Sequence, residues 1–140
     1  MKVLLAYVAT ALLASGCSTT VPVAEAIPVP DSVVGTWEFT ATGKDGTSSA
    51  VIRLTDTPSD TCISGNWFRA KVVSADGLKL LDPAYTYSEG RLEVLLTNGL
   101  CDAYSSFIGT ASGTQFSGAH VSYGLFGSTE HGKVIGSRRP

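Results

Sequence analysis

Residues 85–96 read Tyr-Thr-Tyr-Ser-Glu-Gly-Arg-Leu-Glu-Val-Leu-Leu, and they give the clearest sign of secondary structure in this chain. Arg91 and Glu93 alternate with Leu92 and Val94. A period of two is typical of a strand that has one apolar and one polar face. The preceding Ser-Glu-Gly supplies residues that favour a tight turn. This segment therefore predicts two antiparallel strands joined by a hairpin.

The same pattern extends outward over the rest of the chain, which has no sustained apolar period of 3.6 residues. Seven groups of turn-forming residues predict breaks at 42–46, 56–60, 75–77, 88–90, 98–99, 112–113 and 130–132. The strands expected between them cover 34–39, 49–54, 63–73, 78–81 with 85–87, 91–96, 104–110, 114–126 and 133–138. The breaks are too short for crossover helices, so the sheet should be antiparallel.

Closure of this sheet is the expected architecture. Gly118 and Gly124 interrupt the strand expected at 114–126, and glycines inside strands mark the bulges and coiling that allow a sheet to close. Closure also removes exposed edges. The fold predicted for residues 33–140 is a single all-β domain, an antiparallel up-and-down β-barrel of about eight strands.

The N-terminus predicts export and a lipid anchor. Lys2 precedes an apolar run at 3–14, which is too short to span a bilayer, and the run ends in Ala14-Ser15-Gly16-Cys17. This resembles the lipobox of bacterial lipoproteins, with alanine where leucine is usual. The resemblance implies that 1–16 is a removed signal peptide and that Cys17 becomes the lipid-modified (palmitate-bearing) N-terminus. Ser18 then favours the outer membrane. The alternative is an ordinary signal peptide cleaved nearby, which leaves Cys17 as a free thiol.

Residues 17–32 are expected to be a tether. Pro22, Pro28 and Pro30 lie among small residues that carry two charges. Such a composition favours extended chain without a helix, at about 3 Å per residue. The tether would hold the barrel away from the membrane, on the periplasmic or the outer surface.

The remaining cysteines predict a disulfide. With Cys17 assigned to lipid, Cys62 and Cys101 are left as a pair in an oxidising compartment. A bridge over about forty residues would stabilise the fold by roughly 3 to 4 kcal/mol. No CxxC spacing occurs and the chain has two histidines, so neither a metal site nor a cofactor is expected.

Charge and motifs argue against nucleic-acid binding and catalysis. Of ten Lys and Arg residues, Lys2 leaves with the signal, so nine basic residues face twelve acidic ones without a basic patch. His120 is expected within a strand and His131 in a turn, where both are explained structurally. No nucleophile elbow, phosphate loop or HExxH motif occurs. The chain is therefore not expected to be an enzyme.

Residues 34–39, Val-Gly-Thr-Trp-Glu-Phe, resemble the Gly-x-Trp opening of lipocalins, avidins and small periplasmic metalloprotease inhibitors. All of these are up-and-down barrels. The resemblance implies that Trp37 plugs one end of the barrel, with ligand contact as a second possibility. In the protease inhibitors, a segment before the barrel enters the target's cleft, although their cysteines are closer together than Cys62 and Cys101.

Residues 111–116, Ala-Ser-Gly-Thr-Gln-Phe, resemble the Ser-Gly-x-x-Tyr loop of membrane-bound inhibitors of c-type lysozyme. Phe116 replaces the tyrosine. The resemblance implies that Ser112, Gly113 and Phe116 form a loop that enters a lysozyme cleft. Ser112-Gly113 is also an ordinary hairpin turn, and both interpretations remain open.

The expected function is binding. Tyr85, Tyr87 and Tyr104 lie closest to turns and are the aromatic residues expected to be most exposed. The leading hypothesis is a lipid-anchored envelope module that sterically inhibits a hydrolase, a protease or a lysozyme. The alternatives are a lipocalin-type carrier of a small apolar ligand, because barrels of eight strands can hold one, and a structural component of an envelope assembly.

Overall fold

The computed structural model describes residues 33–140. The expected signal peptide, the lipid-modified Cys17 and the tether at 17–32 lie outside the described residues. Within the described part, no helix is long and apolar enough to cross a membrane.

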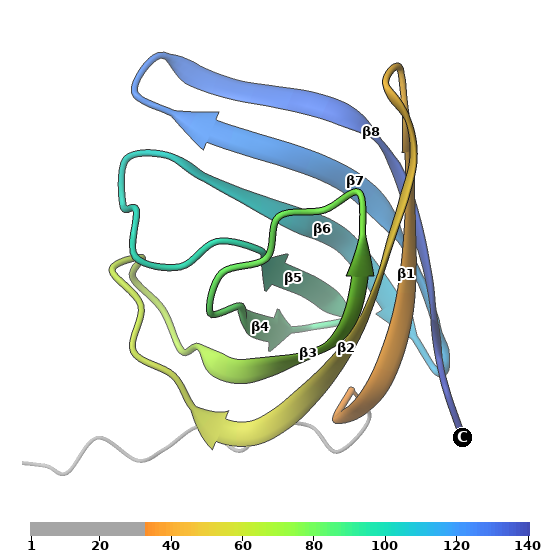
Figure 1. Cartoon of the computed structure of the whole chain (residues 1–140). Coiled ribbons are helices and arrows are strands. Elements are labelled where there is room, and N and C mark those ends of the chain that lie inside the picture. The colour runs from red at the N-terminus through yellow and green to blue at the C-terminus, as the bar shows by residue number, and fades with distance from the viewer. Residues whose placement is uncertain (1–32) are drawn as a thin grey trace, which may run out of the picture.

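Eight antiparallel strands form a closed barrel in which each strand pairs with its neighbours in the chain and β8 pairs with β1 (Figure 1). The strands are β1 (Gly35–Gly43), β2 (Gly46–Pro58), β3 (Phe68–Asp76), β4 (Ala84–Ser88), β5 (Arg91–Leu95), β6 (Tyr104–Ser112), β7 (Gln115–Gly124) and β8 (Gly127–Arg138). This confirms the all-β, up-and-down barrel predicted from alternation and turn spacing.

The boundaries expected at 63–67, 78–81 and 130–132 are wrong. The strand expected at 63–73 begins only at Phe68, because residues 59–67 form the connection between β2 and β3. Residues 130–132 do not form a turn, because β7 and β8 are joined further back, where Gly124 pairs with Gly127. The glycine after His131 instead accompanies a β-bulge, a shift of register between His120 and Val121 of β7. Residues 78–81 are not a strand but part of the connection between β3 and β4, in which Leu81 makes an isolated bridge to Thr97.

Aromatic rings fill the centre of the barrel. Phe39 of β1 lies at the centre of this cluster, with ring centroids 5.6 Å from Phe107 and 5.4 Å from Phe116. Trp37 stacks on Phe39 at 6.1 Å, and its indole N–H donates to the carbonyl of Val33 at 2.8 Å. All five residues are at most 2% exposed. As the resemblance implied, Trp37 is a core residue.

A second, smaller cluster lies outside the barrel wall. Trp67, Ala84 and Leu95 pack together, with Ile63 and Tyr104 against them. The connection between β2 and β3 therefore folds over the outer face of β4 and β5.

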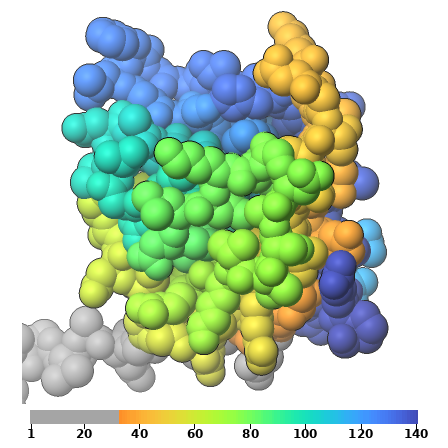
Figure 2. Space-filling model, in the orientation of Figure 1, coloured from red at the N-terminus to blue at the C-terminus, as the bar shows by residue number. Residues whose placement is uncertain are grey.

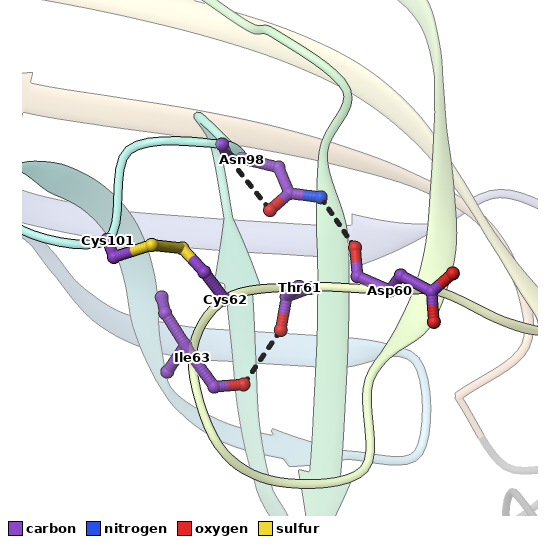
Figure 3. The surroundings of a disulfide bond; sticks show 7 residues. Asp60, Thr61, Cys62, Ile63, Asn98 and Cys101 are labelled. Atoms are coloured by element: carbon purple, nitrogen blue, oxygen red, sulfur yellow. Dashed lines mark hydrogen bonds between the residues drawn. A yellow bond between two sulfur atoms is a disulfide. The ribbon is translucent and has the colours of Figure 1, made fainter.

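The disulfide between Cys62 and Cys101 ties the β2–β3 connection to the β5–β6 connection, as predicted, with Cα atoms 5.5 Å apart (Figure 3). Asn98 reinforces it: its side-chain amide donates to the carbonyl of Asp60 at 3.0 Å, and its oxygen accepts from the N–H of Gly99 at 2.9 Å (Figure 3).

The two ends of the barrel differ. Because neighbouring strands are antiparallel, the connections after β1, β3, β5 and β7 share one end, which we call the mouth. Val33, where the described chain begins, lies at the opposite end, with the turns after β4 and β6.

We expect the double substitution Cys62→Ser/Cys101→Ser to lower the free energy of unfolding by about 3 to 4 kcal/mol. Without the bridge, the unfolded chain gains conformational entropy. Urea unfolding of the oxidised protein and the variant measures the difference. Two titratable thiols in the oxidised wild-type domain, or equal unfolding midpoints, would contradict the prediction.

Candidate functional site

The seven residues expected to bind are divided between the core and the surface. Trp37, Tyr85 and Phe116 are buried, and Tyr85 is 0% exposed, which corrects the expectation that its position near a turn would expose it. Its hydroxyl donates to the carbonyl of Thr55 at 2.6 Å. Tyr87 is half-buried and packs against the core.

Ser112 and Gly113 are exposed at the turn between β6 and β7, away from the mouth. Gly113 has a φ of +59°, which suits the turn interpretation. Phe116 does not project from this turn, because its side chain packs on Phe39 in the core. A cleft-inserting loop at this position would therefore lack its aromatic residue.

Of the seven residues expected to bind, Tyr104 is the one that lines a groove on the surface. It is half-buried at the mouth end and stacks on Tyr123 of β7, with ring centroids 4.8 Å apart. The pKa of Tyr123 is raised above its ordinary value, mainly by burial and to a smaller extent by the nearby carboxylate of Glu93. The two phenol rings thus form one wall beside the β7–β8 hairpin.

A groove of about 410 Å³ runs between this hairpin and the β5–β6 connection. We call it the hairpin groove; its lining residues are Cys101, Asp102, Tyr104, Tyr123, Gly124, Leu125, Gly127 and Ser128. Figure 2 shows the hairpin standing out at the upper left, above the β5–β6 connection.

The tip of this hairpin consists of Leu125 and Phe126, which are 77% and 104% exposed. The other three hairpins carry Lys44-Asp45, Glu89-Gly90 and Gly113-Thr114 at the corresponding positions. Two-residue hairpin loops favour glycine, asparagine and aspartate. The conformational preferences of a two-residue turn therefore do not explain why two large apolar side chains lie at this highly exposed position.

A second feature, which we call the imidazole cavity, opens at the mouth. It has a volume of about 260 Å³ and lies between the β1–β2 hairpin, the start of the β3–β4 connection and the two histidines. Sites for drug-sized molecules span about 300 to 1,000 Å³. The barrel is thus filled at its centre and hollow at the mouth, where the space suits a small ligand.

His120 and His131, the chain's two histidines, meet in this cavity with ring centroids 4.9 Å apart. The rings of His120 and Phe107 lie edge to face with centroids 5.4 Å apart, which joins the cavity to the aromatic core. The imidazole Nε2 of His131 is hydrogen-bonded to the hydroxyl of Ser122. The pKa of His120 is lowered below its ordinary value of 6.5, mainly by burial and to a smaller extent by the nearby His131.

The bulge explains why His131, which is exposed, lines the same cavity as His120. His120 pairs with Gly132 and Val121 pairs with Glu130, so His131 is the extra residue of β8. A bulge re-aims a side chain in this way. Gly132, with a φ of +156°, is required there because a Cβ atom would overlap the carbonyl of Thr42 on β1.

The sequence pattern does not single out Ser122 or Leu125, and it places the two histidines apart. Ser122 and His131 lie on neighbouring strands, and their contact depends on a bulge that alternation does not reveal. The one available signal was Gly132 within a polar strand, because a glycine there often marks a bulge.

Comparisons with family models, with curated proteins and with solved structures gave no match to this chain.

We expect the free energy of unfolding of the wild type to fall more steeply than that of His120→Gln as the pH decreases below about 6.5. A lowered pKa in the folded state means that the unfolded chain binds more protons in this range, so acid favours unfolding. The stabilising effect of neutral His120 is complete above 6.5 and is lost as the pH falls toward the lowered value.

Urea midpoints at pH 7.5 and pH 5 measure this difference. The cavity also contains the exposed Asp45 and His131, the second cause of the lowered pKa, so His131→Gln should reduce the acid-induced loss less than His120→Gln does. An identical acid-induced loss in the wild type and His120→Gln would contradict the prediction.

Proposed function

We propose that this chain is a non-catalytic binding module of the cell envelope, held by lipid at Cys17, which binds a protein partner through the β7–β8 hairpin. The observation that carries the proposal is the Leu125-Phe126 tip, the one hairpin tip of the barrel that is apolar.

The energetics support a protein partner. Burying an exposed leucine or phenylalanine contributes about 1.5 to 3 kcal/mol each, which is the scale of an interface hot spot. Leu100, which is 59% exposed, directly precedes Cys101, which lines the hairpin groove. The disulfide holds this side of the groove, so little loop entropy would be lost on binding.

The position of the tip favours a protein over the lipid bilayer. The chain leads into the barrel at Val33, at the end opposite the mouth, whereas the hairpin tip belongs to the mouth. An anchor that precedes Val33 would therefore be joined to the end of the barrel opposite the tip.

The partner class that we propose is a hydrolase, and the mechanism is steric. A narrow hairpin with two apolar side chains at its tip has the shape to enter a cleft and exclude substrate. The same role belongs to a loop or leading segment in the inhibitor families that the sequence resembles. In this chain the hairpin would perform it, because Phe116 is turned into the core.

The contact between Ser122 and His131 does not in itself make a hydrolytic centre. A serine nucleophile needs a base that a third group orients. Among the hydrogen bonds of residues 33–140, His131 is bonded to Ser122 alone.

A carrier role is the second candidate, favoured by the imidazole cavity. Its volume of about 260 Å³ suits a small ligand and not a long acyl chain. Its lining of threonine, serine and histidine also favours a polar ligand over the wholly apolar one expected from the lipocalin resemblance.

A photo-reactive phenylalanine analogue at position 126 tests the proposed interface in intact cells. We expect a single covalent protein adduct, which disappears when Leu125→Ser is added. The matched control places the analogue at Ile135, which is 64% exposed on β8. Adducts of equal yield at both positions, or none at 126, would exclude the hairpin as the interface.

We expect Cys17→Ser to abolish incorporation of labelled palmitate and to release the protein from the membrane fraction, because a durable anchor requires acyl chains. Cys101→Ser, which leaves the lipobox intact, serves as the control and should still be labelled. Continued palmitate labelling of the Cys17→Ser protein would show that the anchor has been assigned to the wrong residue.

A further inference from the structure

We propose that His120 and His131 bind one divalent first-row transition-metal ion, Cu²⁺ or Zn²⁺, at the mouth of the barrel. Neither the hairpin interface nor the sequence motifs call for such a site, and the Leu125-Phe126 tip lies outside the imidazole cavity. The inference therefore stands independently of the proposed function.

The separation of the two rings fits a shared ion. An imidazole nitrogen binds such an ion at about 2.0 to 2.1 Å, which puts the ring centroid about 3.2 Å from the ion. Two rings that meet at a tetrahedral angle then have centroids about 5 Å apart. The centroids of His120 and His131 are 4.9 Å apart, and the ring planes are inclined by 42°.

Ser122 supplies the outer contact that histidine ligands require. A metal-bound imidazole almost always donates its second N–H to an oxygen, which fixes the tautomer and the ring orientation. When Nε2–H of His131 donates to the hydroxyl of Ser122, the lone pair of His131 lies on Nδ1 and is free for an ion.

The charges around the cavity favour a cation. Asp45 lines it, and among the described residues that form its wall there is neither lysine nor arginine. Imidazole is a preferred ligand of copper and zinc, whereas a magnesium or calcium ion would call for a set of oxygen ligands.

The site would be open to exogenous ligands. Within residues 33–140, no three His, Cys, Asp or Glu residues cluster closely enough to hold a metal ion. Two imidazoles leave coordination positions for water or a small anion. The imidazole cavity, at about 260 Å³, has room for such a ligand beside the ion.

Metal titration of the mature, lipid-bearing chain in detergent tests the proposal. The protein is kept oxidised at Cys62–Cys101 and is first treated with a chelator to remove bound metal. It carries no affinity tag, so His120 and His131 supply the only imidazole groups in the sample. We expect one Cu²⁺ per chain, with nitrogen couplings from two imidazoles in its paramagnetic resonance spectrum. Zn²⁺ should compete and shift the ring-proton resonances of both histidines.

Single variants assign the ligands. His120→Gln and His131→Gln should each weaken Cu²⁺ binding at least tenfold while the barrel stays folded, as followed by circular dichroism. Ser122→Ala, which removes a positioning residue, should weaken it about tenfold. Ser122→Thr should restore it. Ser105→Ala is the matched control, because Ser105 pairs with Ser122 across the sheet and should leave the affinity unchanged.

The absence of saturable binding at millimolar Cu²⁺ would overturn the proposal. An equal affinity in the folded double variant His120→Gln/His131→Gln would also overturn it, since the ion would then be bound elsewhere.

Discussion

The pairing of β1 with β8 is the interaction on which the rest of this structure depends. It joins residues 37–43 to residues 132–138 and turns an open sheet into a closed barrel. Closure gives every strand two neighbours and creates an inside. The apolar face of each strand then meets those of the others, which is why Phe39 on β1 reaches Phe107 on β6 and Phe116 on β7.

The same closure sets the size and position of the cavity. Large aromatic rings fill the centre, so no long ligand channel remains. Toward the mouth, the core side chains give way to Ala41, Ser48 and Gly132, which are too small to meet across the barrel, and space is left beside the histidines. The β7–β8 pair continues past this level and carries its apolar tip beyond the rim. The two candidate sites are thus consequences of strand length and side-chain volume at one end of a single barrel.

The disulfide and the small outer cluster serve that end as well. The β2–β3 connection starts at the opposite end of the barrel, and packing of Trp67 on Leu95 carries it along the wall toward the mouth. Cys62 then fastens it to the β5–β6 connection beside the hairpin groove. A surface that is held covalently and by packing loses less entropy when it binds. The disulfide and this packing therefore hold the connections that surround the mouth of the barrel.

The class of fold and the pairing of Cys62 with Cys101 could be predicted from local patterns, namely alternation of period two, turn residues and the count of cysteines, which do not depend on distant contacts. The core position of Trp37 was implied by the resemblance of residues 34–39 to the Gly-x-Trp families. The burial of individual aromatic residues such as Tyr85 could not be predicted without the fold, and neither could the meeting of His120, Ser122 and His131. Their meeting depends on register and on one bulge, and those are set by packing between strands rather than by any residue's neighbours in the chain.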